Sequence, residues 1–217
     1  MAELPAYIDI VFEDRLSEAV IDKLLTLAPV ELAVNRRFPA RGSGYIRKRI
    51  AMYNRVAEFQ AYFVLADADT PECPKRVLES WLPEPRHRNC LFRLAVPTVE
   101  AWLVADREGI AAFLGISVAN VTKGPDSLVD AKQHLLALAA RSRSRRLRED
   151  LLPPVNGTAR QGPSYNPAMI GFVKRHWHIE SACANSQSLA RAVRHVRGFR
   201  PSTPLVGGTT GRRQATP

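Results

Sequence analysis

The sequence predicts an α/β fold in which a parallel sheet of about four strands is flanked by helices and followed by a mostly helical C-terminal extension. Three observations lead to this prediction. Apolar runs of β-forming residues recur in the first half of the chain, segments with helical spacing separate them, and no strand-like run follows residue 107. Short strands that alternate with helices form right-handed crossovers, and therefore a parallel sheet.

The predicted elements follow one another along the first half of the chain. A strand at 7–12 leads to a helix at 16–25, and a short strand at 30–34 precedes a polar Gly/Pro loop at 35–45. The later elements are a basic amphipathic helix near 46–59, a buried strand at 61–66, a helix from Pro71 and Pro74 through Trp81, a strand at 91–96 and a helix from Thr98.

The sequence of the second half of the chain predicts helices joined by polar segments. They lie at 107–115, 128–148, 167–177 and 186–198, with a Pro/Gly/Asn-rich stretch at 153–167. The length of 217 residues suits one main core. We therefore expect an α/β core at 1–107, a helical portion packed on it at 108–198, and a disordered Pro/Gly/Thr-rich tail at 199–217.

The composition indicates a polyanionic partner. Lys and Arg outnumber Asp and Glu by 31 to 21, which gives a formal net charge of +10 and favours DNA or RNA, although an ordinary enzyme with a basic tail is the alternative. Cys73, Cys90 and Cys183 are too far apart for a disulfide framework or a zinc knuckle, which indicates the cytoplasm. The opening residues resemble no signal peptide and no apolar run reaches spanning length, so we expect neither export nor membrane insertion.

Acidic side chains follow three of the predicted strands. Glu13 comes after IDIVF, Asp67 and Asp69 come after AYFVLA, and Glu100 lies just past LFRLAV. The carboxyl ends of parallel strands meet at one edge, so these carboxylates are expected to lie together. If the backbone stays extended, Asp67 and Asp69 also point to the same side and can share Mg²⁺ or Mn²⁺. The alternatives are a solvated turn for the D-x-D pair and a helix first-turn role for Glu100.

These residues resemble the Toprim domain of topoisomerases, primases and overcoming-lysogenization-defect nucleases, which has a Glu after its first strand and a D-x-D after a later one. More narrowly, the chain resembles an uncharacterised Toprim-like bacterial family often encoded beside an SMC-type ATPase and linked to phage defence. The resemblance spans roughly residues 7 to 135. It is carried by EDRLSEAVIDKLL, RGSGYIRKRI, LADADTPEC, the VEAWLVAD segment from Val99 to Asp106, and VDAKQHL.

The resemblance implies a metal-dependent nuclease with Glu13, Asp67, Asp69 and Glu100 as catalytic residues. The first three would bind Mg²⁺ or Mn²⁺, and an ATPase would be the partner. The Toprim pattern usually has Gly where Asp14 stands, and often a third acidic residue where Pro71 stands. These two differences favour the alternative of a non-catalytic nucleic-acid-binding or regulatory subunit. A small-molecule phosphotransfer enzyme is disfavoured, because the chain has no P-loop.

Two basic segments are candidates for contact with a phosphate backbone. The first is the Gly-rich loop at 41–44 and the helix after it, with Arg41, Arg47 and Lys48; a flexible loop beside a solvated helix face is the alternative. The second is the run at 141–148, for which a solvated helix is the alternative. Its candidates are Arg141, Arg143, Arg145 and Arg146.

Overall fold

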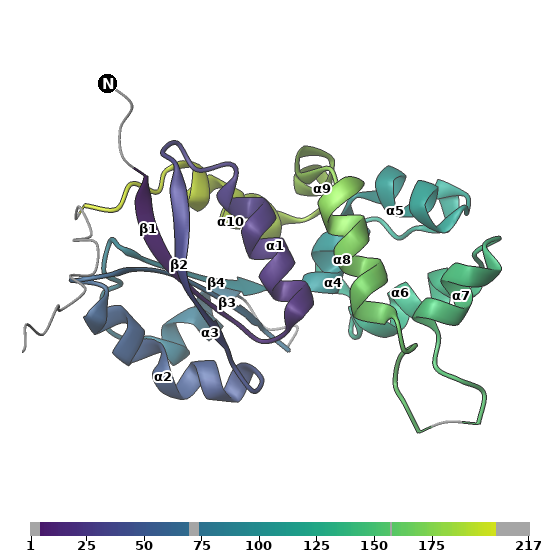
Figure 1. Ribbon diagram of the computed structural model, residues 1–217, viewed down its shortest axis with the longest axis horizontal. Helices are drawn as coiled ribbons and strands as arrows, with labels where there is room; N and C mark the ends of the chain where they lie inside the picture. Colours follow the sequence, from purple (N-terminus) through teal and green to yellow (C-terminus); the bar gives the residue numbers. More distant parts are fainter. Residues whose placement is uncertain (1–4, 70–73, 157, 203–217) are drawn as a thin grey trace, which may run out of the picture.

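The computed structural model describes residues 5–69, 74–156 and 158–202 and has the predicted α/β fold (Figure 1). Four parallel strands form one sheet in the order β2-β1-β3-β4, so that β2 and β4 are its edges. The central strands are mostly apolar, as expected for a sheet covered on both faces, although β1 contains the buried Asp9. The strands are β1 (Ala6–Phe12), β2 (Leu32–Pro39), β3 (Ala61–Asp67) and β4 (Cys90–Ala95).

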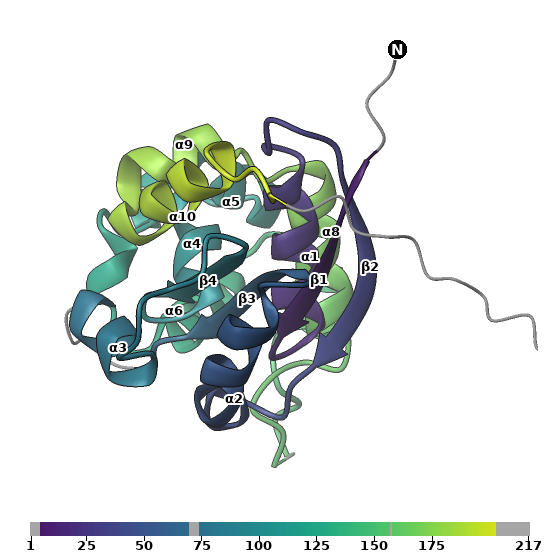
Figure 2. The same cartoon turned by 90° about the vertical axis from the view of Figure 1, so that its left-hand side faces the viewer.

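Helices cover both faces of the sheet. In Figure 1, α1 (Arg15–Leu25) and α10 (Gln187–Arg197) lie on one side, while α2 (Ser43–Val56) and α3 (Pro74–Trp81) lie on the other. Alternate residues of each strand supply the two cores: Phe63 packs with the α1 face and Val64 with the α2 face. The turned view in Figure 2 shows the same separation.

The helical part lies beyond the carboxyl ends of the strands (Figure 1). Its core is continuous with the α1 side of the sheet. Trp102 of α4 is fully buried at this junction, and its Nε1 donates a hydrogen bond to Ser188 Oγ of α10 at 3.0 Å. The elements are α4 (Val99–Ala105), α5 (Arg107–Leu114), η1 (Val118–Asn120), η2 (Pro125–Ser127), α6 (Ala131–Ala140), α7 (Arg145–Leu151), α8 (Tyr165–Arg175) and α9 (Ile179–Asn185).

The second strand is longer than predicted. The sequence predicted a strand at 30–34 and a loop from 35, but β2 continues through Pro39. Polar residues are tolerated there because β2 is an edge strand whose side chains find partners on neighbouring elements. Asn35 Nδ2 donates to the buried Asp9 Oδ1 at 2.9 Å, and Arg37 Nη1 lies 3.0 Å from Asp22 Oδ1 of α1.

Two helical predictions also require correction. The helix predicted at 128–148 is two helices, α6 and α7, because Ser142 is buried between them and donates to Leu114 O at 2.6 Å. Ser144 then caps α7 by accepting from the Leu147 N–H. The short helix α9 was not predicted. It is only two turns long, so its apolar periodicity is weak.

The chain returns to the sheet after α10. Phe199 is buried, and Ser202 N donates to Asn89 Oδ1 at 3.0 Å. Phe199 and Ser202 therefore belong to the ordered fold, although the sequence predicted a disordered tail from residue 199. The rest of that tail, 203–217, lies outside the described residues, as do Pro71 and Cys73. Within the described part of the chain, no helix has the length and apolar character needed to cross a bilayer.

Candidate metal and nucleic-acid site

Glu13 and Asp67 meet at the carboxyl edge of the sheet. Glu13 follows β1, and Asp67 is the last residue of the neighbouring strand β3. The Asp67 N–H donates to Glu13 Oε1 at 2.8 Å. The side chain of Asp67 in turn accepts from the N–H of Val99, at the start of α4, with 3.0 Å between Oδ1 and N. Backbone hydrogen bonds at strand and helix ends therefore hold both carboxylates in place.

Asp69 joins the same edge by a different route from the one predicted. The expectation of an extended backbone through Asp67 and Asp69 is wrong, because Asp69 has a φ of 53° and the strand ends at Asp67. Aspartate adopts this left-handed conformation more readily than most residues. The turn is fixed by the Asp69 N–H, which donates to Pro97 O at 3.1 Å. Asp69 Oδ2 then accepts from Ser43 Oγ at 3.0 Å, at the beginning of α2.

Burial and the charges of neighbouring acidic side chains raise the pKa of Glu13 and of Asp67. Burial raises the pKa of Glu13 to about 7, against the hydrogen bond from the Asp67 backbone, and the charges of Asp69 and Asp14 add to the rise. The pKa of Asp67 lies well above its ordinary value because of burial, followed by the charges of Glu100, Glu13 and Asp69. Four carboxylates from three strand ends thus act on one another, and a proton or a cation at this edge relieves their repulsion.

Glu100 is held from the helical part of the molecule. It lies in the first turn of α4 and is 4% exposed. Its Oε2 accepts from Thr98 Oγ1 at 2.7 Å, and its Oε1 accepts from the Tyr165 hydroxyl at 3.1 Å. Lys132 Nζ lies 3.7 Å from the same Oε1 and 4.7 Å from the centre of the Tyr165 ring. Glu100 is therefore the member of the edge that already has a cationic partner.

Tyr165, Lys132 and Ser43 belong to the site, although the sequence did not single them out. Tyr165 begins α8 and Lys132 lies on α6, so both reach Glu100 from distant positions in the chain. No local spacing relates them to a strand end. Ser43 had a weaker signal, since it stands in the Gly-rich loop next to Gly42, whose φ of 88° allows the chain to turn into α2.

The donor chemistry of this edge fits a divalent metal ion. Glu13, Asp67 and Asp69 offer carboxylate oxygens, which are the hard ligands that Mg²⁺ and Mn²⁺ prefer. Among the described residues, no three His, Cys, Asp or Glu side chains are already arranged as a set of metal ligands. The oxygens of Glu13 and Asp67 that accept backbone N–H bonds would have to turn, or share their remaining lone pairs, to bind a metal.

The first basic segment begins beside the acidic edge. Arg41, Arg47 and Lys48 are exposed on or next to α2, whose first residue is the Ser43 that contacts Asp69. The sequence of α2 contains no acidic residue. Its outer face also carries Tyr45, which is 37% exposed. This helix therefore presents a cationic surface that starts at the carboxylates.

The second basic segment lies elsewhere. In Figure 1, α7 is on the side of the helical part that faces away from the sheet. Arg145 Nε lies 2.7 Å from Glu149 Oε1, and Arg146 Nε lies 3.7 Å from Asp150 Oδ2, so both have carboxylate neighbours one turn away. Arg141 Nη1 donates to Asn120 Oδ1 at 3.2 Å, while Arg143 is exposed. The structure does not bring these arginines to the acidic edge.

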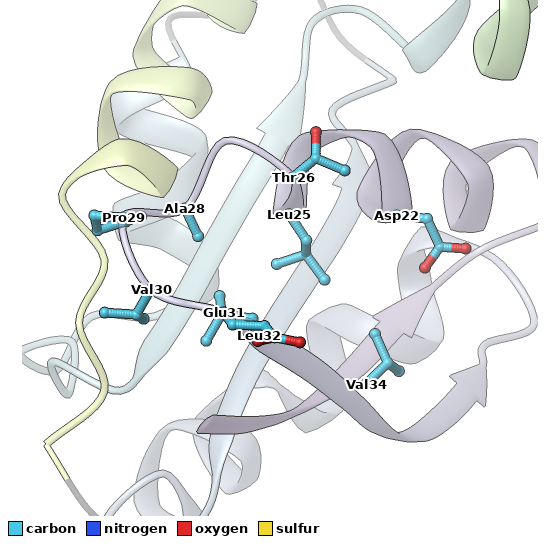
Figure 3. A pocket seen from close by; sticks show the side chains of 9 residues that line it. All are labelled: Asp22, Leu25, Thr26, Ala28, Pro29, Val30, Glu31, Leu32 and Val34. Atoms are coloured by element: carbon cyan, nitrogen blue, oxygen red, sulfur yellow. The ribbon is translucent and has the colours of Figure 1, made fainter. Parts of the chain in front are cut away.

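A hollow of about 430 Å³ lies near the opposite end of the strands. It is formed where α1 ends and β2 begins, with Leu25, Pro29 and Leu32 on its wall and Asp22 and Glu31 at its polar side (Figure 3). The acidic candidates do not line it. It is therefore separate from the proposed chemistry.

No protein-family model, curated protein or solved structure matches the chain. The acidic edge is therefore interpreted from its own geometry and chemistry.

Proposed function

We propose that this chain is a Toprim-like, metal-dependent nuclease that hydrolyses phosphodiester bonds. The observation that carries the proposal is the convergence on Asp67 of the charges of Glu13, Asp69 and Glu100, each from a different strand end or turn. Such a cluster is costly without a counter-charge. A divalent cation bound to a phosphodiester supplies that charge and brings the substrate to the carboxylates.

Asp67 and Asp69 are the proposed metal ligands, and Glu13 is a further ligand or the general acid or base. A bound Mg²⁺ or Mn²⁺ would stabilise negative charge on the phosphate and activate water. With a pKa raised to about 7, Glu13 can accept or release a proton near neutral pH. Tyr165 and Lys132 position Glu100 through its Oε1, and the ammonium group of Lys132 offsets part of the negative charge of Glu100. The contacts of each carboxylate support these proposed roles.

The surface of α2 supports nucleic acid as the substrate. Tyr45, Met52 and Val56 form an exposed stripe along α2, which Phe59 continues in the turn after the helix. Lys48 and Arg55 lie on one side of this stripe. Arg49 lies on the other side, with its guanidinium carbon 3.8 Å from the centre of the Tyr45 ring. Arginine and lysine neutralise phosphates, and aromatic rings stack on bases. A strand bound along this helix would lead to the acidic edge at Ser43. The proposed partner ATPase and the role in defence against foreign nucleic acid rest on the family resemblance.

A non-catalytic nucleic-acid-binding or regulatory subunit is the second candidate. It is favoured by Asp14, which stands where the Toprim pattern usually has Gly. Asp14 caps α1, because its Oδ1 accepts from the N–H of Ser17 at 2.8 Å and from its hydroxyl at 2.9 Å. In this role the acidic edge would bind metal and phosphate without cleaving the bond.

A cleavage assay separates the two candidates. Plasmid, linear duplex, single-stranded DNA and RNA are incubated with the protein in Mg²⁺, Mn²⁺ or EDTA, with and without the ATPase partner. The nuclease predicts metal-dependent cleavage that Asp67→Ala and Glu13→Ala both abolish, whereas the matched surface change Asp22→Ala leaves it intact. Binding without cleavage under every metal, with the ATPase present, would reject the nuclease and favour the regulatory subunit.

A further inference from the structure

Arg93 is a buried cation that forms no ion pair with the described residues. It lies in the middle of the edge strand β4 and is 6% exposed. Its neighbours two positions away, Leu91 and Ala95, belong to the core on the α1 and α10 side, so strand alternation directs Arg93 to that side. The guanidinium donates no hydrogen bond to any residue in the described ranges, and its Nε is both buried and unpartnered. Buried charges are normally paired, because an isolated one loses its hydration without compensation.

The charged groups that act on Arg93 and its neighbour His195 of α10 are mainly cationic. Burial and the nearby charge of Arg86 together lower the pKa of Arg93 to about 9, against the effect of Cys90. Burial also lowers the pKa of His195, against the Arg191 carbonyl, and Arg93, Arg86 and Arg194 add to the fall. Among the described residues, no carboxylate contributes to either shift. The charges that act on these two groups are therefore mainly positive, although Glu79 and Glu84 line a hollow together with Arg86.

Backbone contacts hold two members of this cluster. Arg86 Nη1 donates to the carbonyl of Phe92, the residue before Arg93, at 3.3 Å. His195 Nδ1 lies 2.7 Å from Arg191 O within α10. The remaining N–H groups of the Arg86 guanidinium are available for another acceptor. Arg93, as a residue of β4, and Arg86, through its contact with Phe92 O, are thus both positioned by the strand before any ligand arrives.

We propose that Arg93, with Arg86 beside it, forms a binding site for a phosphate-type oxyanion at the outer edge of β4. Guanidinium groups bind tetrahedral oxyanions through paired N–H donors. Neighbouring guanidinium groups carry more positive charge than a single carboxylate can balance, which favours a phosphate as the ligand. The anion is inorganic phosphate or a backbone phosphate of nucleic acid, which share this chemistry. The site does not involve the acidic edge and holds whether or not that edge cleaves nucleic acid.

The first test measures binding without divalent metal. The full chain is titrated in EDTA with inorganic phosphate and, separately, with a short single-stranded oligonucleotide at constant ionic strength, because screening alone changes surface electrostatics. Saturable binding is expected with at least one of the two probes, and the probe that binds identifies the source of the phosphate. Arg93→Met and Arg86→Gln are expected to weaken that binding about 10-fold or more. The control Arg88→Gln, in the same loop and exposed, leaves the affinity unchanged.

The second test uses thermal stability, which does not depend on activity. The ligand stabilises the wild-type protein because it binds the folded state only. In anion-free buffer, Arg93→Met is expected to melt at a higher temperature than wild type, because the unpaired charge is removed, and to lose the response to the ligand. Arg86→Gln keeps the fold even if Arg93→Met does not, and its response to the ligand must also fall. The proposal is overturned if neither probe binds. It is also overturned if Arg86→Gln binds as well as wild type, as the control Arg88→Gln is expected to do.

Failure of this site and failure of the nuclease are distinguishable. Asp67→Ala is expected to abolish cleavage and leave binding in EDTA unchanged. Arg86→Gln is expected to leave cleavage intact and to weaken the binding of inorganic phosphate in EDTA. If Asp67→Ala removes phosphate binding in EDTA, the anion binds elsewhere and the proposal at Arg93 is wrong.

Discussion

Tyr165 donates a hydrogen bond to Glu100 across 65 positions of the chain, with 3.1 Å between its hydroxyl and Oε1. Both side chains are buried, and Lys132 lies beside the same carboxylate oxygen. Burial and the Glu100 charge raise the pKa of Tyr165 above its ordinary value, so the hydroxyl remains a donor. The helical part therefore contributes directly to the order of the acidic edge.

Tyr165→Phe is expected to destabilise the fold by about 1–2 kcal/mol, because the buried Glu100 loses a hydrogen bond and keeps its charge. Urea unfolding measures the change. Tyr45→Phe on the exposed side of α2 is the matched control and is expected to have little effect. Equal stability of the two variants would show that the Tyr165 hydroxyl contributes nothing.

The raised pKa of Glu13 predicts that the free energy of unfolding falls as pH rises in metal-free buffer. Its pKa is 4.5 ordinarily and about 7 in the fold, so the folded state binds the extra proton between these values. The relative stabilisation is complete below about pH 4.5 and is lost as pH rises towards about 7. Urea unfolding in EDTA at several pH values is expected to show a smaller decline in Glu13→Gln. Glu58→Gln, exposed beyond α2, should keep the wild-type decline; an unchanged profile in Glu13→Gln contradicts the prediction.

Mg²⁺ or Mn²⁺ is expected to raise the melting temperature, more at pH 8 than at pH 5, because protons compete for the same carboxylates. Asp67→Asn should increase stability in EDTA, since it removes a buried charge among like charges, and should abolish the response to metal. Asp22→Asn, near Arg37, is the control. A metal response that survives in Asp67→Asn would place the ion elsewhere.

Asp106→Ala is expected to cost about 2–4 kcal/mol, because this buried carboxylate caps α5 and also joins it to the segment before α9. Its Oδ1 accepts from Gly109 N at 3.2 Å and its Oδ2 from His178 N at 2.7 Å. Asp130→Ala, which removes an exposed cap of α6, should cost about 1 kcal/mol. Comparable losses measured by denaturant unfolding would contradict the linking role of Asp106.

Binding of single-stranded DNA in EDTA should depend on the α2 surface. Lys48→Gln is expected to reduce the slope of log affinity against log salt by about 0.7, the contribution of one phosphate contact. The double variant Arg145→Gln and Arg146→Gln tests the competing surface on α7, where both arginines lie near carboxylates. Fluorescence anisotropy measures both slopes. If only the α7 variant changes the slope, the strand does not follow α2.

The sequence predicts the sheet and the chain positions of the acidic edge because both depend on local patterns. The strands end at Phe12, Asp67 and Ala95, and parallel topology brings such ends together. The edge strand β2 was less visible, since Asn35 and Arg37 are stabilised by residues on other elements. Local propensity carries no information on such tertiary pairing.

The side chains around Glu100 could not be predicted for a related reason. Tyr165 and Lys132 reach it only because α6 and α8 fold back over the end of the sheet. Asp69 illustrates the opposite problem: the sequence predicts an extended backbone there, but the turned backbone depends on the contact with Pro97 O. Arg93 gives no signal in the sequence beyond one charge inside an apolar strand.

The return of the chain to Asn89 through Ser202 has a consequence for biosynthesis. The helix that completes the cover of β4 is α10, the last one before that return. On a ribosome, therefore, the part of the α1 side of the sheet that belongs to β4 stays uncovered until α10 has emerged, long after the strand itself. Contacts of such large sequence separation form late and slowly. We expect nascent chains that stop before α10 to aggregate or recruit chaperones, and the sheet to acquire its stable form only once α10 has packed against β4.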